Sequence, residues 1–230
     1  MLPLTIIPEF CEDLTSAALK AFLDENAVAR LKIYDERELL TVAGMLGKPI
    51  PSQRNGEVIE VLTVSTSQDS KRNSMSSRFG MGAFPFHTDQ AFMHDPARYI
   101  LLYHRLPLSC RPTLAIRIDL RTLSLEEHDC FLRGVWRVAT GSTAFYTSLL
   151  DERLISASFR LRYDPCIMNP VCSLAKKAAT TLERIIRTKP LDHYYSEREC
   201  LILDNWRTLH GRGIDTKDEG TRQLLRISVR

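Results

Sequence analysis

The sequence has almost no excess of one charge. Its 230 residues carry 31 Lys and Arg against 28 Asp and Glu, which gives a formal net charge of +3. A nucleic-acid-binding protein gathers basic residues on one face, and no such cluster stands out here. Charged residues make up 26% of the chain and apolar residues 44%, a balance that excludes a broadly disordered protein. We therefore expect a small-molecule partner and no nucleic acid.

Long apolar runs are also absent. A helix that crosses a membrane needs about 20 consecutive apolar residues. The longest candidate run, residues 99–103, is far shorter than that. The N-terminal residues also lack the basic segment, apolar stretch and small-residue cleavage site of a secretory signal. The sequence thus predicts no membrane partner and a cytoplasmic location.

Cysteine is sparse and irregularly spaced. A disulfide-rich scaffold has a higher density of cysteine, and no pair here has the C-x-x-C spacing of a zinc or redox motif. We expect reduced, mostly structural thiols. The six cysteines are Cys11, Cys110, Cys130, Cys166, Cys172 and Cys200.

Linkers and internal repeats are missing as well. No stretch is rich enough in Pro, Gly or Ser to separate domains, so we expect residues 1–230 to form a single domain. From residue 99 onward, short β-type runs outnumber helical ones. This pattern predicts a mainly β fold, a sandwich or barrel core with flanking helices packed outside it.

Periodicity gives the positions of the expected elements. Asp35 is a suitable N-cap with Glu38 three residues later, and Ser124 can cap Glu126 and Glu127. Helices are expected over residues 14–23, from 35 to about 46, from 124, and over 173–189. The polar stretch 68–77 is expected to be a loop. Strands are expected at residues 58–64, 99–104, 113–120, 159–163, 199–204 and 224–229.

The strongest local motif is Phe-Pro-Phe-His-Thr-Asp at residues 84–89. His87 and Asp89 are two residues apart, so they point to the same side of an extended strand. An imidazole and a carboxylate placed in this way can provide two adjacent metal ligands. A third ligand from a distant histidine would complete the 2-His-1-carboxylate facial triad of non-haem Fe(II) oxygenases. Taken alone, H-x-D also arises by chance.

A candidate third ligand is His210, 123 residues after His87. It follows the apolar strand expected at 199–204, and we expect it just past the end of that strand. The distance along the chain is long enough for the polypeptide to leave a barrel and return to it. The alternative interpretation is a core histidine packed beside Trp206.

Arginines lie close to the C-terminus. If residues 223–229 form a strand, Arg222, Leu224 and Arg226 share one face. Arginine in a barrel interior is costly unless it meets an anion, and guanidinium suits bidentate binding of a carboxylate. The alternative is an edge strand with solvated arginines.

The combination resembles a known family. Four motifs follow one another in the chain: F-P-x-H-x-D at 84–89, Arg-Pro-Thr-Leu at 111–114, D-N-x-x-x-x-H at 204–210 and R-x-x-x-R at 222–226. Their order resembles that in the Fe(II)/2-oxoglutarate-dependent dioxygenases of the taurine dioxygenase and clavaminate synthase group. The resemblance covers about residues 58–230. It implies a double-stranded β-helix, or jelly-roll, core over 58–230, with inserted helices and with residues 1–57 as helical and strand support.

The resemblance also implies a cofactor set and a role for each matching residue. The cofactors would be Fe(II), 2-oxoglutarate as co-substrate, and O2. Asn205 and Trp206 would shape the wall beside the iron. The expected roles are iron ligation by His87, Asp89 and His210, binding of 2-oxoglutarate by Arg222 and Thr113, and contact of Arg226 with either 2-oxoglutarate or an anionic group of the substrate.

The implied reaction is hydroxylation of an unactivated C–H bond in a small amino-acid-like or carboxylate-bearing substrate, with succinate and CO2 as co-products. Desaturation or cyclisation in natural-product biosynthesis is an alternative within the same family. Two further alternatives lie outside this family. The first is a non-catalytic jelly-roll protein that binds a small acid, and the second is a metal hydrolase or isomerase on a cupin-like barrel. The sequence leaves open whether the chain forms a homo-oligomer.

Overall fold

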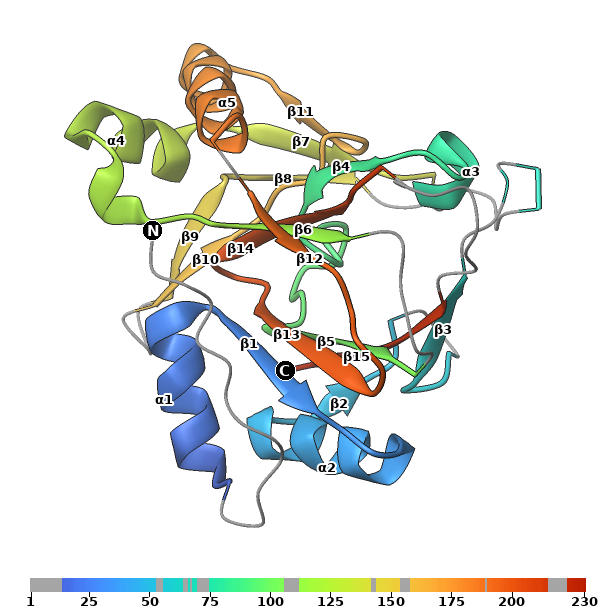
Figure 1. The fold of residues 1–230 in the computed structure, drawn as a ribbon. Coiled ribbons are helices and arrows are strands. Elements are labelled where there is room, and N and C mark those ends of the chain that lie inside the picture. The colour runs from blue at the N-terminus through green and yellow to red at the C-terminus, as the bar shows by residue number, and fades with distance from the viewer. Residues whose placement is uncertain are drawn as a thin grey trace.

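The computed structural model describes residues 14–52, 56–63, 66, 68–69, 75–105, 112–141, 144–153, 158–188, 190–214 and 223–230. Within these ranges the strands all pair antiparallel and the helices lie on the outside (Figure 1). Among the described residues, no helix has the length and apolar character that crossing a membrane requires. The helices are α1 (Ser16–Asn26), α2 (Glu36–Leu46), α3 (Met75–Phe79), α4 (Leu125–Arg133) and α5 (Ser173–Ile186).

Two sheets form the centre of the molecule. We call the larger one the main sheet; its order is β1-β13-β5-β15-β2, and β3 also pairs with β15. The other, the minor sheet, has the order β12-β6-β14-β4. The main sheet contains β1 (Val28–Lys32), β2 (Pro49–Ile50), β3 (Glu60–Thr63), β5 (Tyr99–His104), β13 (Glu199–Asp204) and β15 (Gln223–Val229). The minor sheet contains β4 (Phe84–His87), β6 (Thr113–Arg117), β12 (Leu191–His193) and β14 (Thr208–Arg212).

The remaining strands lie outside these sheets, in a three-stranded sheet of order β11-β7-β8 and a hairpin of β9 and β10. Their bounds are Trp136–Ala139 (β7), Ala144–Thr147 (β8), Leu150–Arg153 (β9), Ser158–Leu161 (β10) and Met168–Pro170 (β11). The architecture confirms the expected mainly β fold with a jelly-roll core and flanking helices. β1 and β2 come from the first 57 residues and pair within the main sheet, while the division of the chain at residue 57 stays a prediction.

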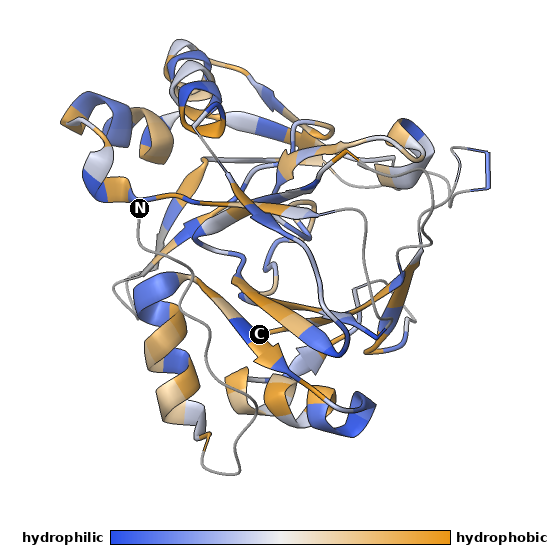
Figure 2. Ribbon diagram, viewed as in Figure 1, coloured by the Kyte–Doolittle hydropathy of each residue, from blue (hydrophilic) through white to orange (hydrophobic). Residues whose placement is uncertain are grey.

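The central strands of the main sheet, β5 and β13, have buried side chains on both faces. On β5, Leu101 and Tyr103 belong to the apolar cluster on the side of α1 and α2, and Ile100 and Leu102 belong to the cluster between the two sheets. Successive residues of a strand point to opposite faces, so a strand covered on both sides is apolar throughout. Figure 2 shows this pattern clearly for β13, most of which is coloured as hydrophobic.

The helices cover the two sheets from outside. α1 and α2 pack on the main sheet, and Asp35 caps α2 by accepting hydrogen bonds from the backbone N–H groups of Arg37 and Glu38 at 2.9 Å each. α4 and α5 pack on the minor sheet through the cluster that contains Ile116 and Leu209. The expected caps at Asp35 and Ser124 are thus confirmed.

Two local expectations are wrong. Residues 75–77, expected in a polar loop, begin helix α3, because Met75 to Phe79 provide an apolar residue at each end of a helical turn. His210, expected just beyond a strand, lies inside β14. The chain reverses at residues 205–207 and immediately forms this second strand, which the polar sequence Thr-Leu-His-Gly-Arg conceals.

Candidate active site

Strand pairing in the minor sheet brings two histidines together. β14 runs antiparallel to β4, and His210 is directly opposite His87 in the register. The two imidazole centroids are 4.6 Å apart. The register shifts between His210 and Arg212, at Gly211. These histidines are 123 residues apart in sequence, so their proximity depends entirely on the fold.

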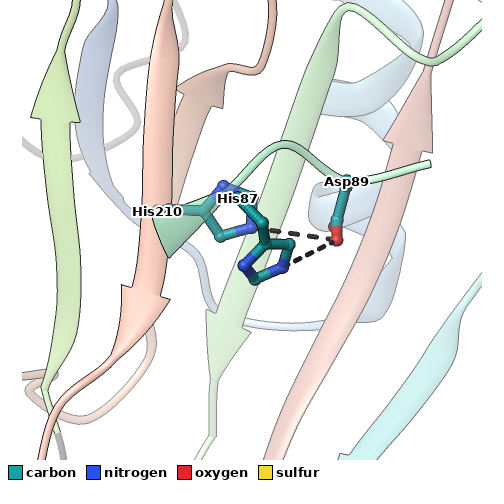
Figure 3. A group of neighbouring side chains, drawn as sticks. All are labelled: His87, Asp89 and His210. Carbon is teal, nitrogen blue, oxygen red and sulfur yellow. Dashed lines mark ion pairs between the residues drawn. The ribbon is translucent and has the colours of Figure 1, made fainter. Parts of the chain in front are cut away.

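Asp89 completes the group. It follows β4 by two residues, and its Oδ1 lies 3.6 Å from Nε2 of His87 and 3.8 Å from Nε2 of His210. Figure 3 shows both imidazoles facing this one carboxylate oxygen. One ligand atom from each of the three residues lies within 4.8 Å of the others, and all three side chains are buried. Two imidazole nitrogens and one carboxylate oxygen are the donor set of a facial triad.

The charges within this group favour a bound cation. Burial by itself raises the pKa of Asp89, but Arg226 and the two imidazoles hold that pKa far below its ordinary value, so the carboxylate is ionised. Burial lowers the pKa of His87, whereas its contact with Asp89 and the charge of Asp164 raise it, with a net upward shift. An ionised carboxylate between two imidazoles in a buried position fits a divalent metal ion.

The backbone of Asp89 is fixed by a neighbouring amide. Asn205 accepts a hydrogen bond from the Asp89 N–H at 2.8 Å and donates to its carbonyl at 3.1 Å. The same side-chain amide donates to the carbonyl of Ala97 at 3.0 Å, and Gln90 accepts from the Ala97 N–H at 2.9 Å. The turn that carries the carboxylate is therefore tied down at several points.

Arg226 links the carboxylate to a second acidic residue. From β15 it donates to Oδ2 of Asp89 at 2.8 Å and to Oε2 of Glu60 at 2.7 Å. Glu60 is directly opposite Arg226 in the pairing of β3 with β15. Because Arg226 occupies Oδ2, only Oδ1 of Asp89 faces the two imidazoles. This arrangement favours a carboxylate that contacts a metal through one oxygen.

A cavity of about 490 Å³ surrounds these residues. Its size falls within the range of small-molecule sites, about 300–1,000 Å³. It opens between the two sheets and mixes apolar with charged side chains. Besides the triad, its lining includes Glu60, Arg78, Gln90, Phe92, Leu102, Thr113, Thr140, Asp164, Arg212, Leu224 and Arg226.

Thr113, the first residue of β6, lies in the lining of this cavity. It pairs with Arg212 in the register of β6 and β14, and the pair Ala115 and His210 follows two residues on. Thr113 and the iron-ligand candidate His210 therefore share the inner face of the minor sheet. The Thr113 hydroxyl forms a 2.8 Å hydrogen bond with the hydroxyl of Tyr195.

Several sequence expectations have different outcomes. Arg222 lies outside the described residues, so its role stays a prediction. Asn205 contacts the turn that carries Asp89, but Trp206 lines a different cavity of about 350 Å³. Arg162, which by its sequence position could have reached the cavity, is not part of the lining; it donates to the carbonyls of Ala91 and His94 and so supports the loop after Asp89.

Four residues of the cavity lining have no role that the sequence predicts: Glu60, Arg78, Gln90 and Asp164. Glu60 belongs to a short strand whose register with β15 the sequence does not reveal. Arg78 lies on α3, only the first three residues of which fall in the expected loop 68–77, and it donates to the carbonyl of Cys166 at 2.7 Å. For Asp164 the one local signal is the segment Phe-Arg-Leu-Arg-Tyr-Asp at 159–164, which adds to the family resemblance but indicates no role for the carboxylate.

The chain has clear structural likenesses at low sequence identity. No protein-family model and no curated protein matches it. A structure of asparagine oxygenase with Fe(II), 3-hydroxyasparagine and succinate is similar with a TM-score of 0.75 and 19% identity, over 93% of this chain and 78% of the other. The non-haem iron oxygenase OrfP with Fe, succinate and (3S)-hydroxy-L-Arg is similar with a TM-score of 0.73 and 20% identity, over 94% and 79%.

A second OrfP structure, with Fe and alpha-ketoglutaric acid, has a TM-score of 0.72 at 20% identity and covers 93% of this chain and 78% of its own. Likeness at this identity establishes architecture. The resemblance seen in the sequence is thus confirmed at the level of the fold: this chain has the jelly-roll fold of the non-haem iron oxygenases.

Proposed function

We propose that this protein is a non-haem Fe(II)/2-oxoglutarate-dependent oxygenase that hydroxylates a small amino acid. The observation that carries the proposal is the convergence of His87, Asp89 and His210 on one point of a buried cavity. Its fold is that of oxygenases whose structures hold iron together with succinate or alpha-ketoglutaric acid. The products would be the hydroxylated amino acid, succinate and CO2.

His87, Asp89 and His210 would hold the Fe(II). With 2-oxoglutarate and O2, bound iron supplies the oxidising power that an unactivated C–H bond requires. The chain's own residues restrict how the metal is held. Arg226 keeps Oδ2 of Asp89 occupied, which leaves a single carboxylate oxygen for the metal and free coordination positions for the co-substrate and O2.

Thr113 and Arg222 would bind the distal carboxylate of 2-oxoglutarate. Two observations support this role for the Thr113 hydroxyl: Thr113 lines the cavity, and it lies on the same face of the minor sheet as His210. A guanidinium is the usual bidentate partner of a carboxylate. Arg222 immediately precedes β15, the strand that carries Arg226.

An amino-acid substrate is supported by the charges around Arg226. Its bonds to Asp89 and Glu60 use three of its five N–H groups. The remaining donors can bind the substrate's carboxylate, and the neighbouring Glu60 carboxylate can accept from the substrate's ammonium group. The structurally similar oxygenases contain hydroxylated arginine and hydroxylated asparagine.

Two oppositely charged residues in the cavity lining bear on which amino acid is bound. Arg78 is exposed and Asp164 is half-buried, and both line the cavity. A polar side chain of the substrate could pair with either charge, whereas an aliphatic side chain could pair with neither. We therefore propose a substrate with a polar side chain in preference to an aliphatic one.

The test is a panel of free amino acids incubated with protein, Fe(II), 2-oxoglutarate and O2. Succinate release is measured alongside the mass of the amino acid. We expect at least one polar amino acid to gain the mass of one oxygen atom in step with succinate. Loss of two hydrogen atoms without added oxygen would instead indicate desaturation or cyclisation.

Matched variants make the assay specific for the proposed site. Asp89→Ala is expected to abolish substrate-dependent succinate formation. His128→Ala is the control, because His128 is half-buried on α4 and packs its ring against Phe159, away from the cavity. Full turnover in Asp89→Ala, or its loss in both variants alike, would contradict the proposal.

A further inference from the structure

We propose that Tyr195 is a positioning residue for the co-substrate and acts through Thr113. This inference rests on the proposed function, because it assumes that the Thr113 hydroxyl binds 2-oxoglutarate. Tyr195 does not line the cavity, whereas Thr113 does. The two hydroxyl groups are 2.8 Å apart, and both residues are almost fully buried, with exposed fractions of 1% for Thr113 and 2% for Tyr195.

The chemistry of a carboxylate fixes the direction of this hydrogen bond. An ionised carboxylate only accepts hydrogen bonds, so the single O–H of Thr113 must be donated to it. The bond between the two hydroxyls can then form only if Tyr195 donates to the Thr113 oxygen. A hydroxyl that accepts one hydrogen bond is a stronger donor of the next. Tyr195 would therefore both orient the Thr113 hydroxyl and strengthen its bond to 2-oxoglutarate.

The fold holds the Tyr195 ring in a defined place. The His193 ring packs edge-on against it with centroids 4.5 Å apart, and the His104 ring lies 5.5 Å away at an angle of 33°. His193 is opposite Thr113 in the pairing of β12 with β6. The tyrosine follows this strand by two residues, so its ring can fold back toward the threonine.

The surroundings of the ring are apolar as well as polar. Tyr195 belongs to the cluster between the two sheets, together with Leu102, Ala115 and Leu201. Burial of this kind limits the rotamers that the ring can adopt and excludes water as a competing partner for the hydroxyl. In such surroundings the hydrogen bond between the Tyr195 and Thr113 hydroxyls favours one geometry, because breaking it would leave a buried polar group unsatisfied.

The experiment measures 2-oxoglutarate affinity from the weak visible absorption band that forms with Fe(II) in the absence of oxygen. We expect Tyr195→Phe to raise the dissociation constant about fivefold, the loss of roughly one hydrogen bond. Thr113→Val is expected to raise it at least as much. Because Tyr195 acts through Thr113, the double variant should be no weaker than Thr113→Val alone.

The control is Tyr103→Phe, which removes the hydroxyl of another buried tyrosine, one on the outer face of β5. It should leave the dissociation constant unchanged. The Michaelis constant of the amino acid should stay the same in Tyr195→Phe, since a general structural defect would change both constants.

The outcomes separate this inference from the proposed function. Normal affinity in Tyr195→Phe, or effects of Tyr195 and Thr113 that multiply in the double variant, would overturn the inference alone. A wild-type protein that binds Fe(II) yet never forms the band would overturn the proposed function and this inference with it.

Discussion

The side-chain amide of Asn205 forms hydrogen bonds with both the N–H and the carbonyl of Asp89. The Asn205 side chain accepts from the Asp89 N–H at 2.8 Å and donates to the Asp89 carbonyl at 3.1 Å. Both residues are buried, and 116 positions separate them in the sequence. Asn205 lies in the tight turn between β13 and β14, five residues before His210. One turn therefore supports two members of the candidate metal site.

The first prediction concerns this amide. Asn205→Ala leaves the N–H and carbonyl of Asp89 buried without their partner, at a cost of about 1–3 kcal/mol for each group left unsatisfied. We expect a lower melting temperature and an Fe(II) affinity weakened by about 10–100-fold, as for other residues that orient metal ligands. Metal titration of the purified variant checks this, and an Fe(II) affinity equal to that of the wild type would refute the role of Asn205.

The second prediction uses the close approach of β14 to β4. A Cβ atom at Gly211 would lie 2.7 Å from the backbone oxygen of Phe84. In Gly211→Ala the two strands must separate, which moves His210 relative to His87. We expect weaker Fe(II) binding and a loss of about 1–3 kcal/mol in the free energy of unfolding.

A matched glycine supplies the control for that variant. Gly44 lies within α2, and an added Cβ there meets nothing within 4 Å. Gly44→Ala should stabilise the protein by about 0.5–1 kcal/mol, since alanine favours a helix interior, and it should leave Fe(II) binding unchanged. Equal metal affinity in the two alanine variants would contradict the role given to the strand contact.

The sequence predicted those parts of the fold that depend on local pattern. The central residues of β5 and β13 are apolar because both strands are covered on both faces, and Asp35 and Ser124 carry the capping chemistry that starts α2 and α4. β14 was missed because its five residues include a histidine, a glycine and an arginine, which face the site and the neighbouring strand. The polar residues that serve the site thus interrupt the apolar pattern from which a strand is predicted.

The candidate triad could be predicted because its residue types and order form a motif. Glu60 could not, since its contact with Arg226 depends on the register of two strands that lie 166 residues apart. Tyr195 has no motif either. Its contact with Thr113 arises only after β12 has paired with β6. Pairing across long stretches of chain thus decides which residues surround the triad.

The third prediction tests whether Arg226 contacts the amino-acid substrate or 2-oxoglutarate. Arg226→Gln removes the charge next to Glu60 and the cavity but keeps an amide N–H that can still donate to Oδ2 of Asp89, and loss of one partner of a buried charged pair costs about 2–5 kcal/mol. We expect the Michaelis constant of the amino acid to rise by roughly a hundredfold, with the dissociation constant of 2-oxoglutarate nearly unchanged. The opposite pattern would assign Arg226 to the co-substrate.

Glu60→Gln serves as the companion variant. The new amide oxygen can still accept from Arg226, so the strand contact is kept while the negative charge is lost. We expect a smaller rise in the Michaelis constant of the amino acid, together with better tolerance of substrates that lack the ammonium group. If these des-amino substrates are rejected as strongly as before, the ammonium group is bound elsewhere.

The fourth prediction concerns stability in acid. The hydrogen bond from the Ser124 N–H and the contact with Arg184 lower the pKa of Glu127 from 4.5 to about 2. A carboxylate with a lowered pKa in the folded state stabilises the protein above its unfolded pKa, and the contribution is lost as the pH falls. Glu127 should therefore stabilise the fold above pH 4.5 and progressively less toward pH 2.

Thermal unfolding across that pH range tests the assignment. Glu127→Gln should melt at a lower temperature than the wild type near neutral pH, and the difference should shrink as the pH falls. Ser124→Ala should also reduce stability, by about 1 kcal/mol, because it removes the N-cap of α4. A difference between wild type and Glu127→Gln that is constant with pH would contradict the lowered pKa.

The central claim is that His87, Asp89 and His210 bind one Fe(II) that also engages 2-oxoglutarate. The most direct measurement is an anaerobic titration of Fe(II) and 2-oxoglutarate, followed by the visible absorption band of their complex in the wild type, His210→Ala and His128→Ala. We predict a saturable band in the wild type and in His128→Ala, and none in His210→Ala. No band in the wild type, or an undiminished band in His210→Ala, would contradict the claim.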